Sequence, residues 1–333
     1  MNRIWVTPDE LRVLGEWTPV GVDFSGSSPW VRWADLRRIR FDDPFFDQSV
    51  QRAMCGGDGG LVETGPEALV EVARATAQVG PTGLFFHAGR CGSTLVANAM
   101  GQHAGTIVVK EPICLSQALL SDPAGRRREW LQALIQCLCI RRSAEHRATI
   151  LKLTSWHVLR IERLRALFPD VPCAFLYRDP VETLVSLLER RPALERELRA
   201  GLLPLAGTIG ASQADLFARF VGGLYDAVIG ERQLALVNYT ELSSGGLDAI
   251  AARFGVQWST AERARVEASR SRDAKATDPS DFTPDTQSKQ RRATAEMRDA
   301  VRRFALAPYE TLESRRRRST EKFPLGEPRA LPG

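Results

Sequence analysis

The chain has 333 residues, of which 44% are hydrophobic and 26% are charged, and its formal net charge is +5. This length and composition are typical of a globular protein with one large α/β domain and an appendage, or with two domains. No run of about 18 apolar residues is present, so no membrane-spanning helix is expected. The basic excess lies largely in short arginine runs, which are typical of solvated faces and tails. No nucleic-acid-binding module is recognisable, and no nucleic-acid partner is expected.

The positions of the cysteines and histidines indicate whether disulfides or a metal site are to be expected. The six cysteines, at positions 55, 91, 114, 137, 139 and 173, form no C-x-x-C pair, and several stand in apolar runs. This pattern favours reduced, buried thiols and a cytoplasmic protein, and the N-terminus lacks the apolar core of a signal peptide. The four histidines are scattered without the spacing of a metal site, so no metal is expected.

Three regions differ in composition along the chain. Residues 1–65 are rich in Trp, Pro, Gly and Asp and end near a glycine-rich stretch, which predicts a small, irregular N-terminal subdomain. Residues 66–310 are predicted to form the main domain, which opens with a helix starting at Pro66. Residues 311–333 are predicted to be a basic, proline-containing tail, disordered beyond Arg315.

From residue 83 onward, strand-like apolar segments alternate with segments of helical apolar spacing. The expected strands are 84–87, 106–109, 149–153, 173–177 and 234–237, and the expected helices include 93–100, 128–140, 158–168, 181–188 and 212–229. This alternation predicts an α/β fold with a three-layer, P-loop-type parallel sheet flanked by helices. Ligands of such sheets bind beyond the carboxyl ends of the strands, so the polar residues that follow each strand are the candidate site.

The first expected strand leads through a glycine-flanked turn into a helix. The turn and the first helical residues are Gly89, Arg90, Cys91, Gly92, Ser93 and Thr94. Backbone N–H groups at a helix start bind anions, and one cation and two hydroxyls accompany them here. The sequence therefore predicts a site for a phosphate or sulfate ester. Arg90 replaces the lysine of a nucleoside-triphosphatase loop and the G-x-x-x-x-G-K-[ST] spacing is absent, so ATP with magnesium is not the expected ligand.

Charged or hydroxyl-bearing residues also follow the other strands, as expected of a sheet with a polar site along one edge. They are Glu111 after the second strand, Lys152 at the end of the third, Arg178 after the fourth with Ser186 in the next helix, and Tyr239 after the fifth.

Together these motifs resemble the sulfotransferase family, whose members move a sulfuryl group from 3′-phosphoadenosine 5′-phosphosulfate (PAPS) to an acceptor. The resemblance spans residues 83 to 310. Arg90–Thr94 is similar to the family's 5′-phosphosulfate loop, and Arg178 and Ser186 match the spacing of its 3′-phosphate pair. Tyr239–Leu242 is similar to its Tyr-Glu-x-Leu segment, which lies near the adenine.

The resemblance implies a PAPS-dependent sulfotransferase without a metal, and it implies a role for each matched residue. Gly89 to Thr94 would bind the 5′ end of the nucleotide, Arg178 and Ser186 the 3′-phosphate, and Tyr239 would lie near the adenine. In-line transfer also requires charge neutralisation at the leaving oxygen. Arg90 and Lys152 are the candidates for the bridging and sulfuryl oxygens.

Glu111 is the expected general base for the acceptor hydroxyl. Thr154 stands where cytosolic small-molecule sulfotransferases carry the catalytic histidine of Lys-Thr-His. Glu111 follows the loop at the place where tyrosylprotein sulfotransferases carry their catalytic Glu, and carbohydrate sulfotransferases of the heparan type also use Glu. The chain thus resembles the Glu-base type more closely, and His157 is the alternative base.

The sequence departs from the family pattern at two places. Cys91 replaces the usual loop serine and removes a hydroxyl donor, although its backbone N–H could still bind the anion. The cytosolic family's C-terminal Arg-Lys-Gly segment is missing. Arg272, Lys275 and Lys289 flank a polar loop that could close over the nucleotide, and Lys275 is the candidate for a phosphate contact.

Two other functions compete with this interpretation. A P-loop kinase or other nucleotide-binding protein would need a loop lysine and a metal-holding Asp after a strand, and neither is found. An inactive sulfotransferase-like module that binds an anionic partner would be favoured if Glu111 and Lys152 pointed away from the loop. The acceptor could be a small molecule, a carbohydrate or a peptide hydroxyl, and the sequence does not indicate the oligomeric state.

Overall fold

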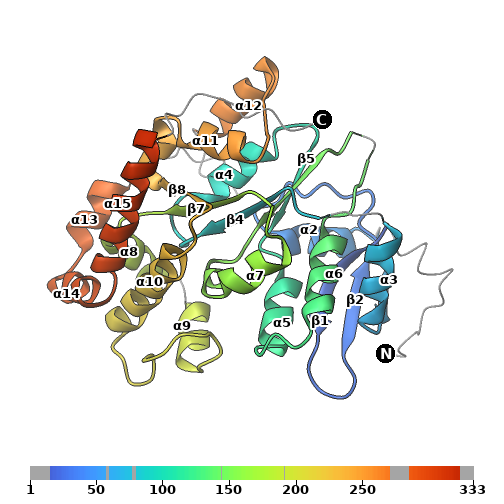
Figure 1. Ribbon diagram of the computed structural model, residues 1–333, viewed down its shortest axis with the longest axis horizontal. Coiled ribbons are helices and arrows are strands. Elements are labelled where there is room, and N and C mark those ends of the chain that lie inside the picture. The colour runs from blue at the N-terminus through green and yellow to red at the C-terminus, as the bar shows by residue number, and fades with distance from the viewer. Residues whose placement is uncertain are drawn as a thin grey trace.

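The computed structural model describes residues 16–57, 60–76, 80–143, 145–190, 192–270 and 285–322, which form two sheets and the helices around them (Figure 1). The strands are β1 Thr18–Asp23, β2 Trp30–Ala34, β3 Leu61–Thr64, β4 Gly83–His87, β5 Thr106–Lys110, β6 Ala148–Lys152, β7 Cys173–Tyr177 and β8 Leu234–Asn238. The helices are α2 Phe46–Cys55, α3 Glu67–Ala75, α4 Ser93–Met100, α5 Ile113–Ser121, α6 Arg128–Leu138, α7 Ile161–Leu167, α8 Pro180–Arg190, α9 Pro192–Arg199, α10 Gln213–Ile229, α11 Gly246–Arg253, α12 Thr260–Arg270, α13 Thr286–Arg292, α14 Ala295–Phe304 and α15 Leu306–Lys322. Two 3₁₀ segments, η1 Ser155–Arg160 and η2 Tyr239–Ser243, follow β6 and β8.

The central sheet has five parallel strands in the order β5-β6-β4-β7-β8. It confirms the predicted α/β fold, and each of the five expected strands is found within one residue of its expected ends. The chain passes from β4 to one edge of the sheet and then returns to place β7 on the other side of β4. Such a reversal opens a crevice at the carboxyl ends of the strands beside β4, which is where these sheets bind ligands.

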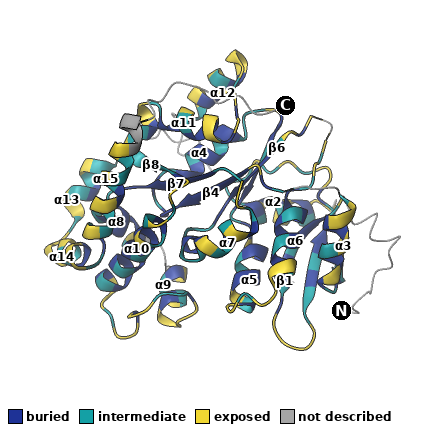
Figure 2. Cartoon of the chain, in the orientation of Figure 1, coloured by how far each residue is buried: buried dark blue, intermediate teal, exposed yellow. Residues whose placement is uncertain are grey.

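Alternate residues of the central strands supply two separate apolar cores, because successive side chains of a strand point to opposite faces. Phe85 belongs to a core with α4 and α11, whereas its neighbour Phe86 belongs to the larger core on the other face. All five residues of β4 are buried, as are all five of β7 (Figure 2). Burial on both faces explains why the sequence of each of these strands is a nearly continuous apolar run.

The N-terminal region is more regular than the irregular subdomain expected from its composition. Its described part forms an antiparallel sheet, β1-β2-β3, together with α2. Side chains of α5 accept hydrogen bonds from backbone amides along the open edge of β1. The amide of Val22 donates to Gln117 Oε1, and that of Phe24, just after the strand, donates to Ser121 Oγ, at 3.0 Å each. The small sheet is therefore fixed to the helix that follows the second strand of the central sheet.

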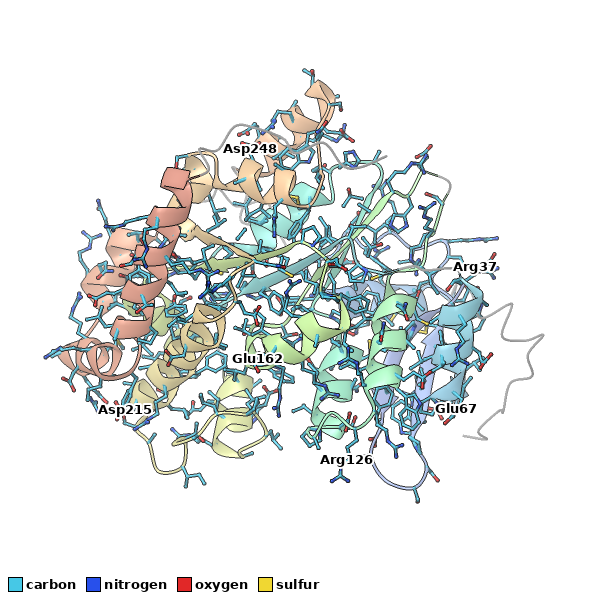
Figure 3. All side chains as sticks on the ribbon, in the orientation of Figure 1. Arg37, Glu67, Arg126, Glu162, Asp215 and Asp248 are labelled. Carbon is cyan, nitrogen blue, oxygen red and sulfur yellow. The ribbon has the colours of Figure 1, made fainter. Side chains whose placement is uncertain are left out.

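The C-terminal basic run lies in a helix up to residue 322, so the expected disorder beyond Arg315 is wrong for that part of the chain. Helix α15 buries Leu312 completely. Its Arg315 guanidinium donates to the carbonyls of the last two residues of α10, Val228 and Ile229, at 2.9 and 3.1 Å. Helix α14 is joined to the other end of α10, where Asp215, labelled in Figure 3, pairs with Arg303 at 2.7 Å.

Two smaller features differ from or extend the sequence analysis. The helix expected over 158–168 begins as the 3₁₀ segment η1 and becomes α-helical only at Ile161. Within the described ranges, no helix has both the length and the apolar character needed to cross a membrane.

Replacing Arg315 by Ala should destabilise the protein, because several carbonyls at the end of α10 lose a charged donor. We expect urea denaturation to show a loss of about 1–3 kcal/mol in the free energy of unfolding. Arg317→Ala is the matched control: the side chain lies on the same helix but is 72% exposed, and its replacement should change stability by less than about 0.5 kcal/mol. Equal effects of the two changes would show that α15 is not held through Arg315.

Candidate functional site

The loop between β4 and α4 has a backbone shape suited to an anion. Gly89, Arg90 and Gly92 have left-handed φ values of 78°, 53° and 84°. These left-handed residues turn the chain sharply into α4, whose start presents N–H groups without helical partners and the positive end of the helix. A Cβ on Gly92 would lie 2.9 Å from Leu242 Cδ1, so this position requires glycine for space as well as for φ.

The side chains of the loop divide between the site and the core. Thr94 Oγ1 is a buried atom that finds no hydrogen-bond partner within the described residues, which indicates a place for a polar ligand. Cys91 is fully buried, and its Sγ donates to the Leu176 carbonyl at 3.3 Å. The thiol therefore points into the core beside α4, and only the backbone of Cys91 is directed toward an anion.

Arg90 and Ser186 join the loop to α8. The Arg90 Nε donates to Ser186 Oγ at 2.7 Å, and Ser186 is 2% exposed. The sequence analysis paired Ser186 with Arg178 through their spacing, and the structure gives it Arg90 as a direct partner. The two motifs at the ends of β4 and β7 therefore meet, as their neighbouring strands require.

Arg178, at the end of β7, is engaged by two carboxylates. Its Nε donates to Glu182 Oε2 at 2.6 Å and its terminal nitrogen to Asp285 Oδ1 at 2.7 Å. Its guanidinium also lies over the Tyr239 ring, 4.1 Å from the centroid. Burial lowers the pKa of Arg178, but the hydrogen bond and charge of Asp285 and the charge of Glu182 outweigh it and raise that pKa above its ordinary value.

Lys289 of α13 is a second cation at this place. Its Nζ lies 2.6 Å from Asp285 Oδ2, so the buried Lys289 and Arg178 hold one carboxylate between them. Burial and the nearby charges of Arg178 and Arg90 lower the pKa of Lys289, against the opposing effect of Asp285. We call Arg178, Lys289, Glu182 and Asp285 the Arg178 cluster.

The sequence analysis chose Lys275 for this neighbourhood, and that residue lies outside the described residues. It named Lys289 only as one of the basic residues flanking a polar loop. Nothing in the local sequence distinguishes Lys289 from the arginines of the same helix, because its burial comes from the packing of α13 against α8.

Glu111 lies beyond the end of β5 in a left-handed conformation, with φ of 54°. Its amide donates to the Lys152 carbonyl at 2.7 Å, and its carboxylate Oε1 accepts a hydrogen bond from Lys152 Nζ. Lys110 and Lys152 are register partners on adjacent strands. Regular strand alternation would direct Glu111 away from them, and the left-handed residue breaks the alternation so that its carboxylate reaches Lys152.

His87 completes this group and was missed by the sequence analysis. Its Nε2 lies 3.4 Å from Glu111 Oε1, and its Nδ1 accepts from the Gly89 amide at 3.0 Å. Burial raises the pKa of Glu111, but the charge of Lys152 and the contact with His87 hold it well below its ordinary value. A signal was present, because His87 is the polar last residue of an apolar strand. We call Glu111, Lys152 and His87 the Glu111 cluster.

The N-terminal region forms a wall beside the Glu111 cluster. The Phe45 ring centroid is 5.8 Å from Lys152 Nζ, and Lys110 Nζ donates to the Asp43 carbonyl at 2.9 Å. Asp47 of α2 accepts from the Ile113 amide at 3.1 Å, at the start of α5. Burial raises the pKa of Asp47 to about 6 and lowers that of Lys110 to about 8.

His157, the alternative base, is fully buried in η1. Its Nε2 pairs with Ser116 Oγ at 2.8 Å, and burial lowers its pKa to about 3. A fully enclosed ring whose Nε2 is engaged by Ser116 is not placed to reach an acceptor hydroxyl, which makes His157 the poorer candidate.

Metal and thiol chemistry find little support in the described parts of the chain. No group of three or more His, Cys, Asp or Glu side chains there could hold a metal ion. None of the six cysteines, all of which lie in the described ranges, forms a disulfide, and all except Cys55 are buried.

Comparison with known proteins gives likeness at the level of shape only. No protein-family profile matches the chain, and no curated protein matches its sequence. The sulfotransferase domain from the curacin biosynthetic pathway matches at 11% identity over 68% of this chain and 98% of that one, with a TM-score of 0.43. Sulfotransferase STF9 from Mycobacterium avium matches at 14% identity over 79% and 82%, with a TM-score of 0.45. Mouse sulfotransferase SULT7A1, solved with PAP, matches at 15% identity over 76% and 90%, with a TM-score of 0.31. TM-scores below 0.5 carry no argument about function, so function is inferred below from the site alone.

Proposed function

We propose that the chain is a sulfotransferase that moves a sulfuryl group from PAPS to an acceptor hydroxyl. One observation carries the proposal: two anion sites end adjacent strands and are joined by the bond between Arg90 and Ser186. The first is the loop after β4, with the partnerless Thr94 hydroxyl. The second is the Arg178 cluster, whose two cations already hold a carboxylate. A nucleotide with anionic groups at both ends of its ribose fits such a pair.

The loop would bind the 5′-phosphosulfate. Backbone amides from Arg90 to Gly92 and the hydroxyls of Ser93 and Thr94 would supply its donors, and Gly89 would contribute through the turn that its φ allows, because its amide is bonded to His87 Nδ1. Arg90 would meet the bridging oxygen, because it stands between the loop and Ser186. A guanidinium suits this place, since its planar fork binds phosphate and sulfate oxygens in pairs.

The Arg178 cluster would bind the 3′-phosphate. Arg178, with Ser186 nearby, would provide the contacts, and Lys289 adds a cation to those that the sequence motifs predict. Tyr239, which stacks on Arg178, would lie near the adenine. Lys275 stays a predicted phosphate contact outside the described residues.

Glu111 would act as the general base, and Lys152 would stabilise the charge that develops on the sulfuryl oxygens. The acceptor oxygen attacks sulfur, the bond from sulfur to the 5′-phosphate oxygen breaks with its electron pair, and the acceptor proton passes to Glu111. Lys152 pairs with Glu111 before the reaction. When Glu111 takes the proton its charge disappears, so the Lys152 ammonium becomes available to the sulfuryl oxygens as charge develops there. No metal has a part in this scheme.

The N-terminal region would shape the acceptor side. We propose a catalytic domain over 66–310, an extension over 1–65 that carries the wall of Phe45 and Asp47, and a C-terminal basic segment over 311–333. The acceptor is a hydroxyl whose carrier the site does not identify. The mostly buried thiols, which form no disulfide in the described residues, support a cytoplasmic setting.

The nucleotide test separates this function from its competitors. Isothermal titration should show 3′-phosphoadenosine 5′-phosphate (PAP) binding without metal, and Arg178→Ala should weaken it about 10-fold or more, since one phosphate loses a charged partner. Preference for ATP with Mg²⁺ would indicate a kinase-like protein instead. Failure of both nucleotides to bind would leave an anion-binding module without this activity.

Replacing Asp285 by Asn should strengthen PAP binding. The Asp285 carboxylate competes for Arg178 and Lys289, and a neutral side chain of the same shape does not; we expect a gain of about 5- to 10-fold. AMP, which lacks the 3′-phosphate, should bind both proteins alike. Asp299→Asn, an exposed partner of Arg303, is the control. Weaker PAP binding by the Asp285 variant would mean that this carboxylate positions the cations rather than competing with the ligand.

Glu111→Gln should keep PAP binding and lose transfer. The amide preserves the shape but cannot take the acceptor proton, so turnover should fall by about 100-fold or more. The measurement is transfer of label from ³⁵S-PAPS to a panel of sugar, phenol, alcohol and peptide acceptors. His157→Gln serves as the comparison, and loss of activity only in that variant would assign the base to His157.

A further inference from the structure

His87 links the anion-binding loop to Glu111 through a single imidazole ring. Its Nδ1 accepts from the Gly89 amide at 3.0 Å, so that nitrogen carries no proton. The neutral ring then holds its proton on Nε2, which lies 3.4 Å from Glu111 Oε1, a polar contact that does not meet hydrogen-bond geometry in this structure. The side chain is 3% exposed, so this geometry is set inside the protein and not by solvent.

The contacts of Glu111 are unequal between its two oxygens. Lys152 Nζ and His87 Nε2 both face Oε1. Within the described residues no hydrogen bond reaches Oε2. A carboxylate whose one oxygen accepts from Lys152 and lies against the Nε2 edge of His87 presents its other oxygen in a set direction, which a proton-accepting group needs.

We propose that His87 is a positioning residue that sets Glu111 Oε2 as the proton-accepting atom and ties its orientation to the shape of the loop. This rests on the proposed function, in which Glu111 is the base. The same ring serves both parts of the site. An anion that orders the Gly89 amide also fixes the ring, and the ring fixes the carboxylate. A bound donor would thereby align the base before the acceptor proton moves.

Two substitutions separate the two contacts of the ring. Asn at position 87 keeps an acceptor at the place of Nδ1 for the Gly89 amide but has no donor for Glu111. Gln keeps a nitrogen donor at the place of Nε2 but loses the acceptor for the loop. A ring that only fills space would make both variants fail alike.

The first experiment needs neither nucleotide nor acceptor. The chain has four histidines, so long-range ¹H–¹⁵N correlation of ¹⁵N-histidine-labelled protein gives few signals, and His87→Asn identifies one of them. The His87 ring should show the Nε2–H tautomer, and its Nε2 shift should move in Glu111→Gln. His103, which pairs with Thr106 at 3.0 Å, is the internal reference and should not move. An Nδ1–H tautomer, or a His87 signal indifferent to Glu111→Gln, would overturn the proposal.

The second experiment separates the effect of each His87 variant on PAP binding from its effect on kcat. His87→Asn should bind PAP within about 2-fold of the wild type and lose about 10-fold or more in kcat. His87→Gln should weaken PAP binding about 3-fold or more and keep the larger share of kcat. Parallel losses in both variants would contradict a positioning role. If the unaltered protein fails to bind PAP, the proposed function fails, while the tautomer and its response to Glu111 still decide whether His87 positions the carboxylate.

Discussion

Charge compensation among buried side chains governs the carboxyl edge of the central sheet. A parallel sheet covered on both faces leaves its strand ends as the place for a polar site, and a site for anions needs cations there. Buried cations are costly unless paired. The chain itself supplies such partners: Glu111 for Lys152, and Glu182 with Asp285 for Arg178 and Lys289. The site is thus held ready by its own carboxylates.

Binding at such an edge is an exchange of anions and not a simple addition. The two carboxylates of the Arg178 cluster differ in this respect. The Glu182 side chain is 7% exposed and lies in the first turn of α8, four residues along the chain from Arg178, whereas that of Asp285 is 42% exposed and directly precedes α13. Glu182 therefore suits a permanent partner that orients the guanidinium, and under the proposed function Asp285 is the partner that the 3′-phosphate would replace. A dianion gains more from two cations than a single carboxylate does, which gives the exchange its direction.

The fold and the strand-end residues could be predicted from the sequence because both follow from local patterns. Apolar runs such as 173–177 specify buried strands, and the polar residue after each run must lie at the edge. Lys289 and the inward turn of Cys91 could not be assigned this way, and for His87 the sequence showed only a polar residue at a strand end. Lys289 is buried by helix packing, the carboxylate that His87 contacts follows another strand, and the direction of Cys91 depends on the left-handed backbone of Arg90 before it. The antiparallel N-terminal sheet likewise depends on α5 to complete its edge.

A hydrogen bond to a buried lysine, as well as packing, holds the N-terminal region against the site. Lys110 and Lys152 stand side by side as register partners, and Glu111 can neutralise only the one it reaches. Lys110 instead donates to the Asp43 carbonyl just before α2, and its lowered pKa reflects its burial and the nearby charge of Lys152. Removal of that backbone would leave Lys110 without this acceptor and free it to compete for Glu111. The antiparallel sheet and α2 therefore protect the pairing of Lys152 with Glu111, so the N-terminal wall and the Glu111 cluster depend on the same contact.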